Sequence, residues 1–182
     1  VPGETSPRRF TTTDPSERSA CDSTLPESDR FDFERVGDIS ESVAAQGETL
    51  ADAICCDSAF APYAEPRWYY NHTEVGFFAK VKAAYKANGN KPVTFYDSAC
   101  GIPLFRVPVN RTLAAFMAET KEHGWPSFRP AELASPDAVR ILPNNYVVSK
   151  CGTPLGSNLP DAKGIRYCLD LSCVSGNPAT AL

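Results

Sequence analysis

Four short segments of this sequence carry residues suited to thiol or metal chemistry. Two are cysteine–glycine turns that follow strand-like runs, which is how zinc knuckles begin: Cys100–Phe105 (CGIPLF) and Cys151–Gly156 (CGTPLG). The other two are Gly124–Phe128 (GWPSF) and Arg166–Asp170 (RYCLD). Cysteine in such segments can act as a nucleophile when it is ionised, or as a metal ligand. A cysteine or tryptophan at an arbitrary position is more often an ordinary core residue, so the residue types alone do not decide.

The order and spacing of the four segments resemble the methionine sulfoxide reductase B family, with GWPSF and RYC as the most specific parts. The resemblance spans roughly Tyr96 to Ser172, under half of the chain. It implies a compact β fold of the Mss4-like, β-tent type. It also implies a reaction in which a thiolate attacks the sulfur of methionine sulfoxide and is left as a sulfenic acid, which a second thiol reduces.

The resemblance assigns roles to individual residues. Cys168 would be the attacking thiol, and Arg166 would favour its thiolate form. Trp125 and Phe128 would shape the apolar pocket that receives the methyl group of oxidised methionine in a peptide or protein.

The sequence departs from the family at positions that the reaction uses. Pro154 and Ser157 stand where the family places histidines, and general acid help from such groups is worth roughly a hundredfold to ten-thousandfold. The asparagine expected two residues after the nucleophile is Asp170, whose charge tends to raise a neighbouring thiol's pKa. His123 replaces the resolving cysteine of many members. His123 and Asp170 remain candidate proton donors, although a lone histidine at a helix end is more often a capping or surface residue.

The zinc site implied by the resemblance is incomplete, because Asp97 and Val148 replace the first cysteine of each pair. Two cysteines cannot hold a structural zinc, so we expect neither a metal nor another cofactor. Since the family's four ligands converge on one ion, the resemblance implies a disulfide between Cys100 and Cys151 instead. Such a bond would add about 2 to 4 kcal/mol of stability.

Five further cysteines are an odd number, which leaves at least one thiol unless a bond leaves the chain, and Cys168 is the candidate. Cys55 and Cys56 are adjacent and seldom bond each other, so each is expected to reach Cys21 or Cys173 and to fasten the preceding segment. Recycling of an active Cys168 would need Cys173 or an external thiol.

Composition sets the broad class. The 182 residues are 42% hydrophobic with a net charge of -4 and no basic block, which predicts one principal domain and argues against nucleic acid as a partner. No apolar run approaches the roughly 20 residues of a membrane-spanning helix. Seven cysteines, with glycosylation sequons at Asn71 and Asn110, favour an oxidising compartment: secreted, or an organelle lumen such as the thylakoid lumen. The chain begins with Val1, so we expect that an upstream segment was removed.

The elements that must position these residues follow from the hydrophobic pattern. Residues 1–66 form a polar, proline-rich and acidic extension with a short helix or two within 39–54, and residues 67–182 form the domain. Helices are predicted over 73–88, ended by Gly89, and after the cap Thr112, ended by Gly124. Strands are predicted over the following short β-rich runs: 93–96, 104–109, 139–142, 146–149 and 165–171. The prediction is an α+β fold, a small antiparallel β domain with packed helices.

Two functions from different classes fit these features. The first is a methionine sulfoxide reductase B-like protein that is catalytically degenerate and serves as a binding or assembly subunit, with a larger protein assembly ordering residues 1–66. The second is an active thiol-dependent peptide methionine-(R)-S-oxide reductase with Cys168 as nucleophile. The missing histidines and resolving cysteine place the first hypothesis slightly ahead.

Overall fold

A computed structural model describes residues 55, 67–71, 76–97 and 102–176. Two α-helices lie fully within them, α3 (Phe77–Ala87) and α4 (Leu113–His123), together with the 3₁₀ turns η5 (Tyr69–Asn71), η6 (Pro130–Glu132) and η7 (Leu171–Cys173). The strands are β1 (Val93–Asp97), β2 (Pro103–Val107), β3 (Ser127–Phe128), β4 (Val139–Ile141), β5 (Tyr146–Ser149), β6 (Pro154–Asn158), β7 (Tyr167–Leu169) and β8 (Val174–Gly176). The predicted helix or two within 39–54, and most of the extension, lie outside the described residues.

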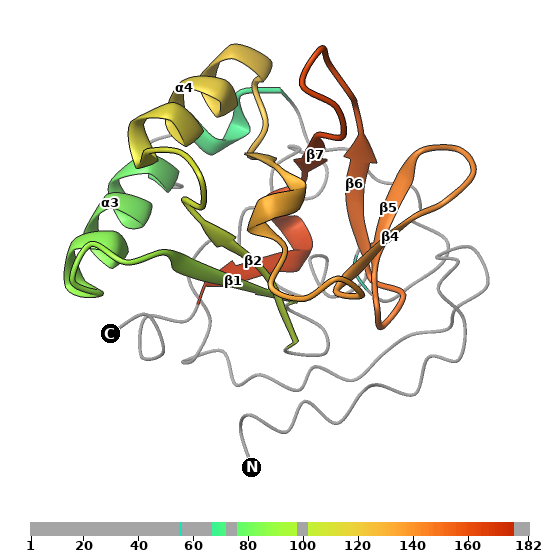
Figure 1. Cartoon of the computed structure of the whole chain (residues 1–182), viewed down its shortest axis with the longest axis horizontal. Helices are drawn as coiled ribbons and strands as arrows, with labels where there is room; N and C mark the ends of the chain where they lie inside the picture. The colour runs from blue at the N-terminus through green and yellow to red at the C-terminus, as the bar shows by residue number, and fades with distance from the viewer. Residues whose placement is uncertain (1–54, 56–66, 72–75, 98–101, 177–182) are drawn as a thin grey trace, which may run out of the picture.

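The strands form two antiparallel sheets. The smaller has the order β2-β1-β8 and the larger the order β3-β7-β6-β5-β4. Turn η7 carries the chain from β7 in the larger sheet directly to β8 in the smaller one. Figure 1 shows α3 and α4 on one side of the domain and β4, β5 and β6 on the other. The predicted α+β class with antiparallel sheets is therefore confirmed.

A cluster of aromatic rings forms the centre of the core. Phe128 of β3 lies at its middle, with ring centroids 4.6 Å from Phe105, 5.4 Å from Phe116 and 5.5 Å from Phe95. Phe77 of α3 joins the cluster through Phe95 and Phe116 at 6.1 and 6.2 Å. All five side chains are fully buried, and burial of each contributes about 1.5 to 3 kcal/mol. The cluster therefore joins both helices to strands of both sheets.

Helix α4 has the boundaries that its sequence predicts. The Thr112 hydroxyl accepts a hydrogen bond from the Ala115 amide at 3.0 Å, and this capping satisfies one of the free amides of the first turn. Gly124 ends the helix at a φ of 90°, with its amide donating to the Thr120 carbonyl.

Helix α3 begins at Phe77, later than predicted, and residues 72–75 lie outside the described residues. Its fully buried positions are Phe77, Val81 and Ala84, while Phe78 is half-buried. The helical spacing of Val75, Phe78, Val81 and Tyr85 in the sequence predicts that these residues share the apolar face, but the structure fully buries Phe77 in place of Phe78. Two adjacent phenylalanines fit helical spacing equally well, and only the aromatic cluster decides which one is buried.

Five strands agree with the prediction to within a few residues, but β3, β6 and β8 were not predicted. Strand β6 contains Pro154 and Gly156, which are typical of turns. Gly156 has a φ of 152°, and a Cβ there would lie 2.2 Å from the Cys168 carbonyl oxygen. The close approach of β6 to β7 therefore requires glycine at position 156. This explains why a residue that is typical of turns stands within a strand.

No helix among the described residues is both long enough and apolar enough to cross a membrane.

Gly156→Ala is expected to reduce the free energy of unfolding by about 3 kcal/mol, because the added methyl group meets the backbone of β7. Gly89→Ala is the control: Gly89 also has a positive φ, of 67°, but a Cβ there would meet nothing within 4 Å. The control is expected to cost only about 1 kcal/mol, the backbone penalty alone. Urea denaturation measures both, and equal losses would contradict the close approach.

Candidate functional site

Cys168 lies in the middle of β7, between two neighbouring strands of the larger sheet. It is directly opposite Ser127 of β3 and Ser157 of β6. Directly opposite residues of antiparallel strands share one face, so the thiol has a serine on each side. Cys168 is 6% exposed, so it is accessible to solvent only at its margin.

The segments GWPSF and RYCLD, about 40 residues apart in the sequence, lie side by side. Besides the β3–β7 pairs, the Leu169 amide donates to the Pro126 carbonyl at 2.9 Å. Trp125 precedes Pro126 in the turn that leaves α4 and is half-buried. The fold thus places the backbone next to Trp125 against the backbone next to Cys168.

Arg67 covers the indole of Trp125. Its guanidinium carbon is 5.7 Å from the Trp125 ring centroid and 5.2 Å from that of Trp68. Its Nε donates to the His123 carbonyl at 2.9 Å, and the Trp68 amide donates to the Gly124 carbonyl at 2.7 Å. A Cβ on Gly124 would lie 2.3 Å from the Arg67 side chain. The segment Arg67–Asn71 is therefore docked on the turn that carries Trp125.

Arg166 is buried and connects the thiol-bearing strand to α4. Its Nη1 donates to Ser127 Oγ at 3.3 Å, and Ser127 Oγ in turn donates to Glu119 Oε2 at 2.7 Å. Arg166 Nε is a buried donor with no hydrogen-bond acceptor in the part of the chain that the structure describes. The guanidinium thus belongs to a polar network and keeps one unused donor.

That network is built on two buried carboxylates, Glu119 of α4 and Glu132 of η6. Arg111 Nη2 contacts Glu132 at 2.6 Å, and its Nη1 contacts Glu119 at 3.2 Å. Arg129 Nη2 contacts Glu119 at 2.6 Å and Asp161 at 2.7 Å. Arg111 also donates to the Ser127 carbonyl at 2.9 Å, which links these ion pairs to β3.

The ion pairs determine the charge of Glu119 and Asp161. Burial by itself would raise the pKa of Glu119, but hydrogen bonds from Arg129 and Ser127 and the charges of Arg111 and Arg129 outweigh it and lower that pKa. The hydrogen bonds that Arg129 donates to Asp161 lower the pKa of Asp161 strongly, and the hydrogen bonds that it donates to Asp161 and Glu119 raise its own pKa. Glu119, Asp161 and Arg129 are therefore ionised near neutral pH.

The other predicted site residues lie in different surroundings. His123 is the last residue of α4, with Nε2 3.9 Å from the exposed Glu122 carboxylate. Asp170 is buried next to η7, and its amide donates to the Leu155 carbonyl at 2.8 Å. Phe128 is fully buried in the aromatic cluster.

The positions at which the resemblance places zinc ligands do not fit a zinc ion. Val148 is buried and has no donor atom, and Cys151 is disulfide-bonded. Asp97 is a buried carboxylate, and Cys100 lies outside the described residues. Although Cys151 is disulfide-bonded, Cys100 is not described, so the Cys100–Cys151 pair stays a prediction.

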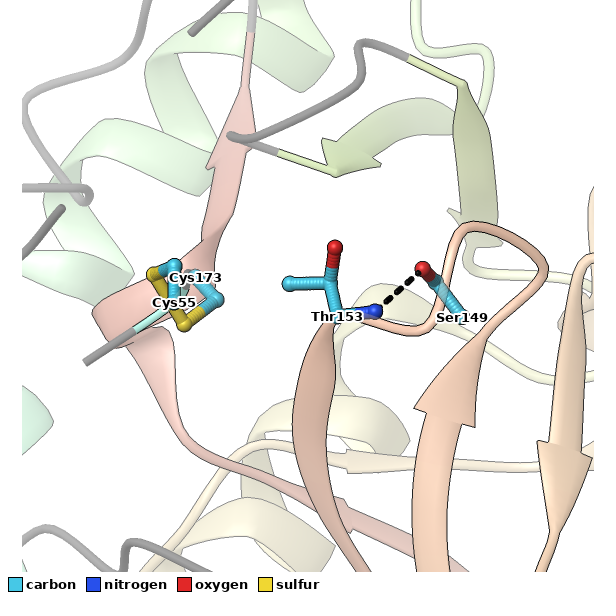
Figure 2. The surroundings of a disulfide bond; sticks show 4 residues. All are labelled: Cys55, Ser149, Thr153 and Cys173. Atoms are coloured by element: carbon cyan, nitrogen blue, oxygen red, sulfur yellow. Dashed lines mark hydrogen bonds between the residues drawn. A yellow bond between two sulfur atoms is a disulfide. The ribbon is translucent and has the colours of Figure 1, made fainter. Parts of the chain in front are cut away.

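Cys55 and Cys173 form a disulfide with a Cα–Cα distance of 5.5 Å, which is one of the pairings that the sequence left open. Figure 2 shows it together with Thr153 and Ser149, whose Oγ accepts a hydrogen bond from the Thr153 amide at 3.2 Å. The bond fastens Cys55 to η7, and it consumes the thiol of Cys173. While this bond is formed, Cys173 is not available as the recycling thiol, which leaves the external thiol of the two alternatives. Disulfides form and persist in oxidising compartments, with which this bond is compatible.

Both sequon asparagines are exposed, as glycan acceptors must be. Asn71 ends η5, and Asn110 precedes Arg111 in the loop before α4. Their occupancy stays a prediction.

Sequence reasoning missed Arg67 and the Glu119 network. One signal was available for Glu119: it follows Leu113 and Phe116 at three-residue spacing, so the charge stands on the apolar side of α4. For Arg67 no local signal exists, because its contacts with His123, Gly124 and Trp125 join residues more than 50 positions apart.

Comparison of the chain with protein-family models and with curated protein sequences gives no match.

Arg67→Ala is expected to increase acrylamide quenching of tryptophan fluorescence. The chain has two tryptophans, and the Arg67 guanidinium lies over both rings, so the signal reports on this contact alone. Arg140→Ala removes an exposed arginine of β4 and should leave quenching unchanged. Identical quenching in all three proteins would show that Arg67 does not cover the indoles.

Glu119→Gln is expected to lower the free energy of unfolding at pH 7 by about 2 to 4 kcal/mol, since it leaves Arg111 and Arg129 with less buried negative charge. Because the folded-state pKa of Glu119 is lowered, its carboxylate stabilises the protein above about pH 4.3 and loses this effect as the pH falls through the folded-state pKa. The variant should therefore lose less stability than the native protein on acidification. Asp137→Asn breaks an exposed ion pair with Lys150 and should change little. Denaturation between pH 3 and 7 measures all three, and similar acid profiles for native and Glu119→Gln protein would contradict the assignment.

Proposed function

We propose that this chain is a catalytically degenerate methionine sulfoxide reductase B-like protein that serves as a binding or assembly subunit. One observation carries the proposal: the guanidinium of Arg67 lies over Trp125, where the resemblance places the methyl group of the substrate. A charged side chain, anchored by two hydrogen bonds of its own segment to the Gly124 turn, opposes entry of a methyl sulfoxide.

The surroundings of Cys168 support the same proposal. Cys168 is only 6% exposed, so a peptide substrate would have little access to its sulfur. Ser157, directly opposite Cys168 on β6, supplies a hydroxyl where the family supplies an imidazole. A serine hydroxyl does not titrate near neutral pH and is a poor general acid.

The positions expected to regenerate the Cys168 thiol after a reaction do not supply a second thiol. Cys173 is bonded to Cys55, and His123 stands where many members have their resolving cysteine. A secreted or lumenal setting, such as the thylakoid lumen, accords with this disulfide and with the exposed sequons, and a larger assembly that contacts residues 1–66 accords with their polar composition.

The alternative is an active peptide methionine-(R)-S-oxide reductase that uses Cys168. It is favoured by the pairing of β3 with β7, which brings the Trp125 turn beside Cys168. It is also favoured by the unused Nε donor of Arg166, which shares the face of Cys168 and is chemically suited to a sulfoxide oxygen. In this reading His123 or Asp170 supplies the proton.

Turnover of a methionine-R-sulfoxide peptide with dithiothreitol tests the proposal. The full chain, Cys168→Ser and Arg67→Ala are expected to show equal, near-zero rates, because a serine replaces the acid and Cys168 is buried. A rate in the full chain that Cys168→Ser abolishes would establish the alternative. Activity that emerges only in Arg67→Ala would mean that the machinery is intact but covered, and it would equally overturn degeneracy.

A further inference from the structure

Two neighbouring hollows lie on the surface outside the Cys168 region. The first encloses about 530 Å³ and is lined by residues of the α3–β1 loop, β1, β2 and η6. The second encloses about 330 Å³ and is lined by residues of the loop before α4, by Arg129 and by Lys163 of the β6–β7 hairpin. Val109 and Ala131 line both, so the two hollows are adjacent, and together they are called the groove.

The groove carries positive charge that the described part of the protein leaves uncompensated. Lys91 and Arg106 line its first hollow and Lys163 its second, and all three are exposed. None of them forms an ion pair with a carboxylate in the described ranges. Arg111 and Arg129 also line the second hollow, but their charge is balanced by Glu119, Glu132 and Asp161. Among the described residues Glu119 is the one carboxylate that lines it, and Glu119 is engaged with Arg111, Arg129 and Ser127.

The charge distribution along the chain strengthens the argument that these three cations attract an anionic ligand. Residues 67–182 contain 13 Lys and Arg against eight Asp and Glu, although the whole chain has a net charge of -4. The excess of acid therefore belongs to residues 1–66, and the domain that carries the groove is basic. A basic hollow on such a domain attracts anionic ligands.

The groove is built on fixed elements. Arg106 is directly opposite Thr94 across β1 and β2, so both side chains project from the outer face of the smaller sheet into the first hollow. Asn88 Nδ2 donates to the Lys91 and Pro92 carbonyls at 3.4 and 3.0 Å, which holds the loop that carries Lys91. Lys91 and Arg106 therefore project from backbone segments that hydrogen bonds hold in place.

We propose that this groove binds an extended acidic segment of a partner protein. Carboxylates of the segment would pair with Lys91, Arg106 and Lys163, and its small apolar side chains would pack on Val109 and Ala131. No aromatic residue among the described ones lines either hollow, and grooves for single-stranded nucleic acid use aromatic rings for base stacking, so an acidic polypeptide fits better than a single strand. The inference rests on the binding role proposed above, for which it names the partner's chemistry.

Fluorescence anisotropy with a labelled peptide of about eight alternating Glu and Leu residues tests this inference on the full chain. The protein is used without glycans, because Asn110 lines the second hollow. Lys91→Glu combined with Arg106→Glu should weaken binding at least about tenfold, and Lys163→Glu should weaken it less. Arg140→Glu makes the same charge change outside the groove and should retain binding. Binding should also weaken with added salt.

Each other outcome overturns the proposal. Equal weakening by Arg140→Glu would indicate nonspecific attraction, and tighter binding of a heparin fragment or an oligonucleotide would indicate a different class of ligand. Carbodiimide couples lysine amines to carboxylates in direct contact. If it joined Lys91 or Lys163 to acidic residues within 1–66 of the same chain, the occupant would be internal and not a partner. The assay measures binding and not turnover, so an inactive protein that fails to bind the peptide would leave degeneracy standing and remove only this inference.

Discussion

Two carboxylates removed from water constrain the arrangement of this domain. Glu119 and Glu132 are almost fully buried, and an isolated buried charge is so costly that Arg111 and Arg129 must remain against them. Because Glu119 is on α4 and Glu132 on η6, while Arg129 also reaches Asp161 beyond β6, the ion pairs join segments that the aromatic cluster alone would not orient. Their joint effect is to hold the two-residue strand β3 in register with β7, so that Ser127 lies opposite Cys168.

The polar network also affects the chemistry of the thiol. Arg166, the cation closest to Cys168 in sequence, donates to Ser127 and through it reaches Glu119, so its positive charge is shared with a carboxylate. A guanidinium compensated in this way stabilises a thiolate less than an isolated one would. The guanidinium of Arg67 lies over the indole of Trp125. The arrangement is therefore better suited to rigidity than to reactivity.

Three features fit a binding role. The segment Arg67–Asn71 is docked on the Trp125 turn, the buried Cys55–Cys173 disulfide ties Cys55 to η7, and the first hollow of the basic groove lies on the outer face of the smaller sheet. The first two anchor the end of the extension to the domain, so residues 1–66 and the groove belong to one molecule of sharply divided charge. Such a division favours assembly with charged partners over the handling of a small neutral sulfoxide.

The amino-acid sequence alone determined the α+β class, the ends of α4 and most of the strands, because caps, glycine stops and β-rich runs act over a few residues. It also brought GWPSF and RYCLD into one hypothesis, although their contact could only be inferred by resemblance. The tertiary structure decided the rest: which of Phe77 and Phe78 enters the core, why Gly156 allows a strand in a turn-like segment, and which cysteine pairs with Cys173. Arg67 and the Glu119 network likewise depend on contacts between distant residues. Contacts of these charged side chains become favourable only when folding removes them from water. A local sequence pattern does not show which side chains folding will bury.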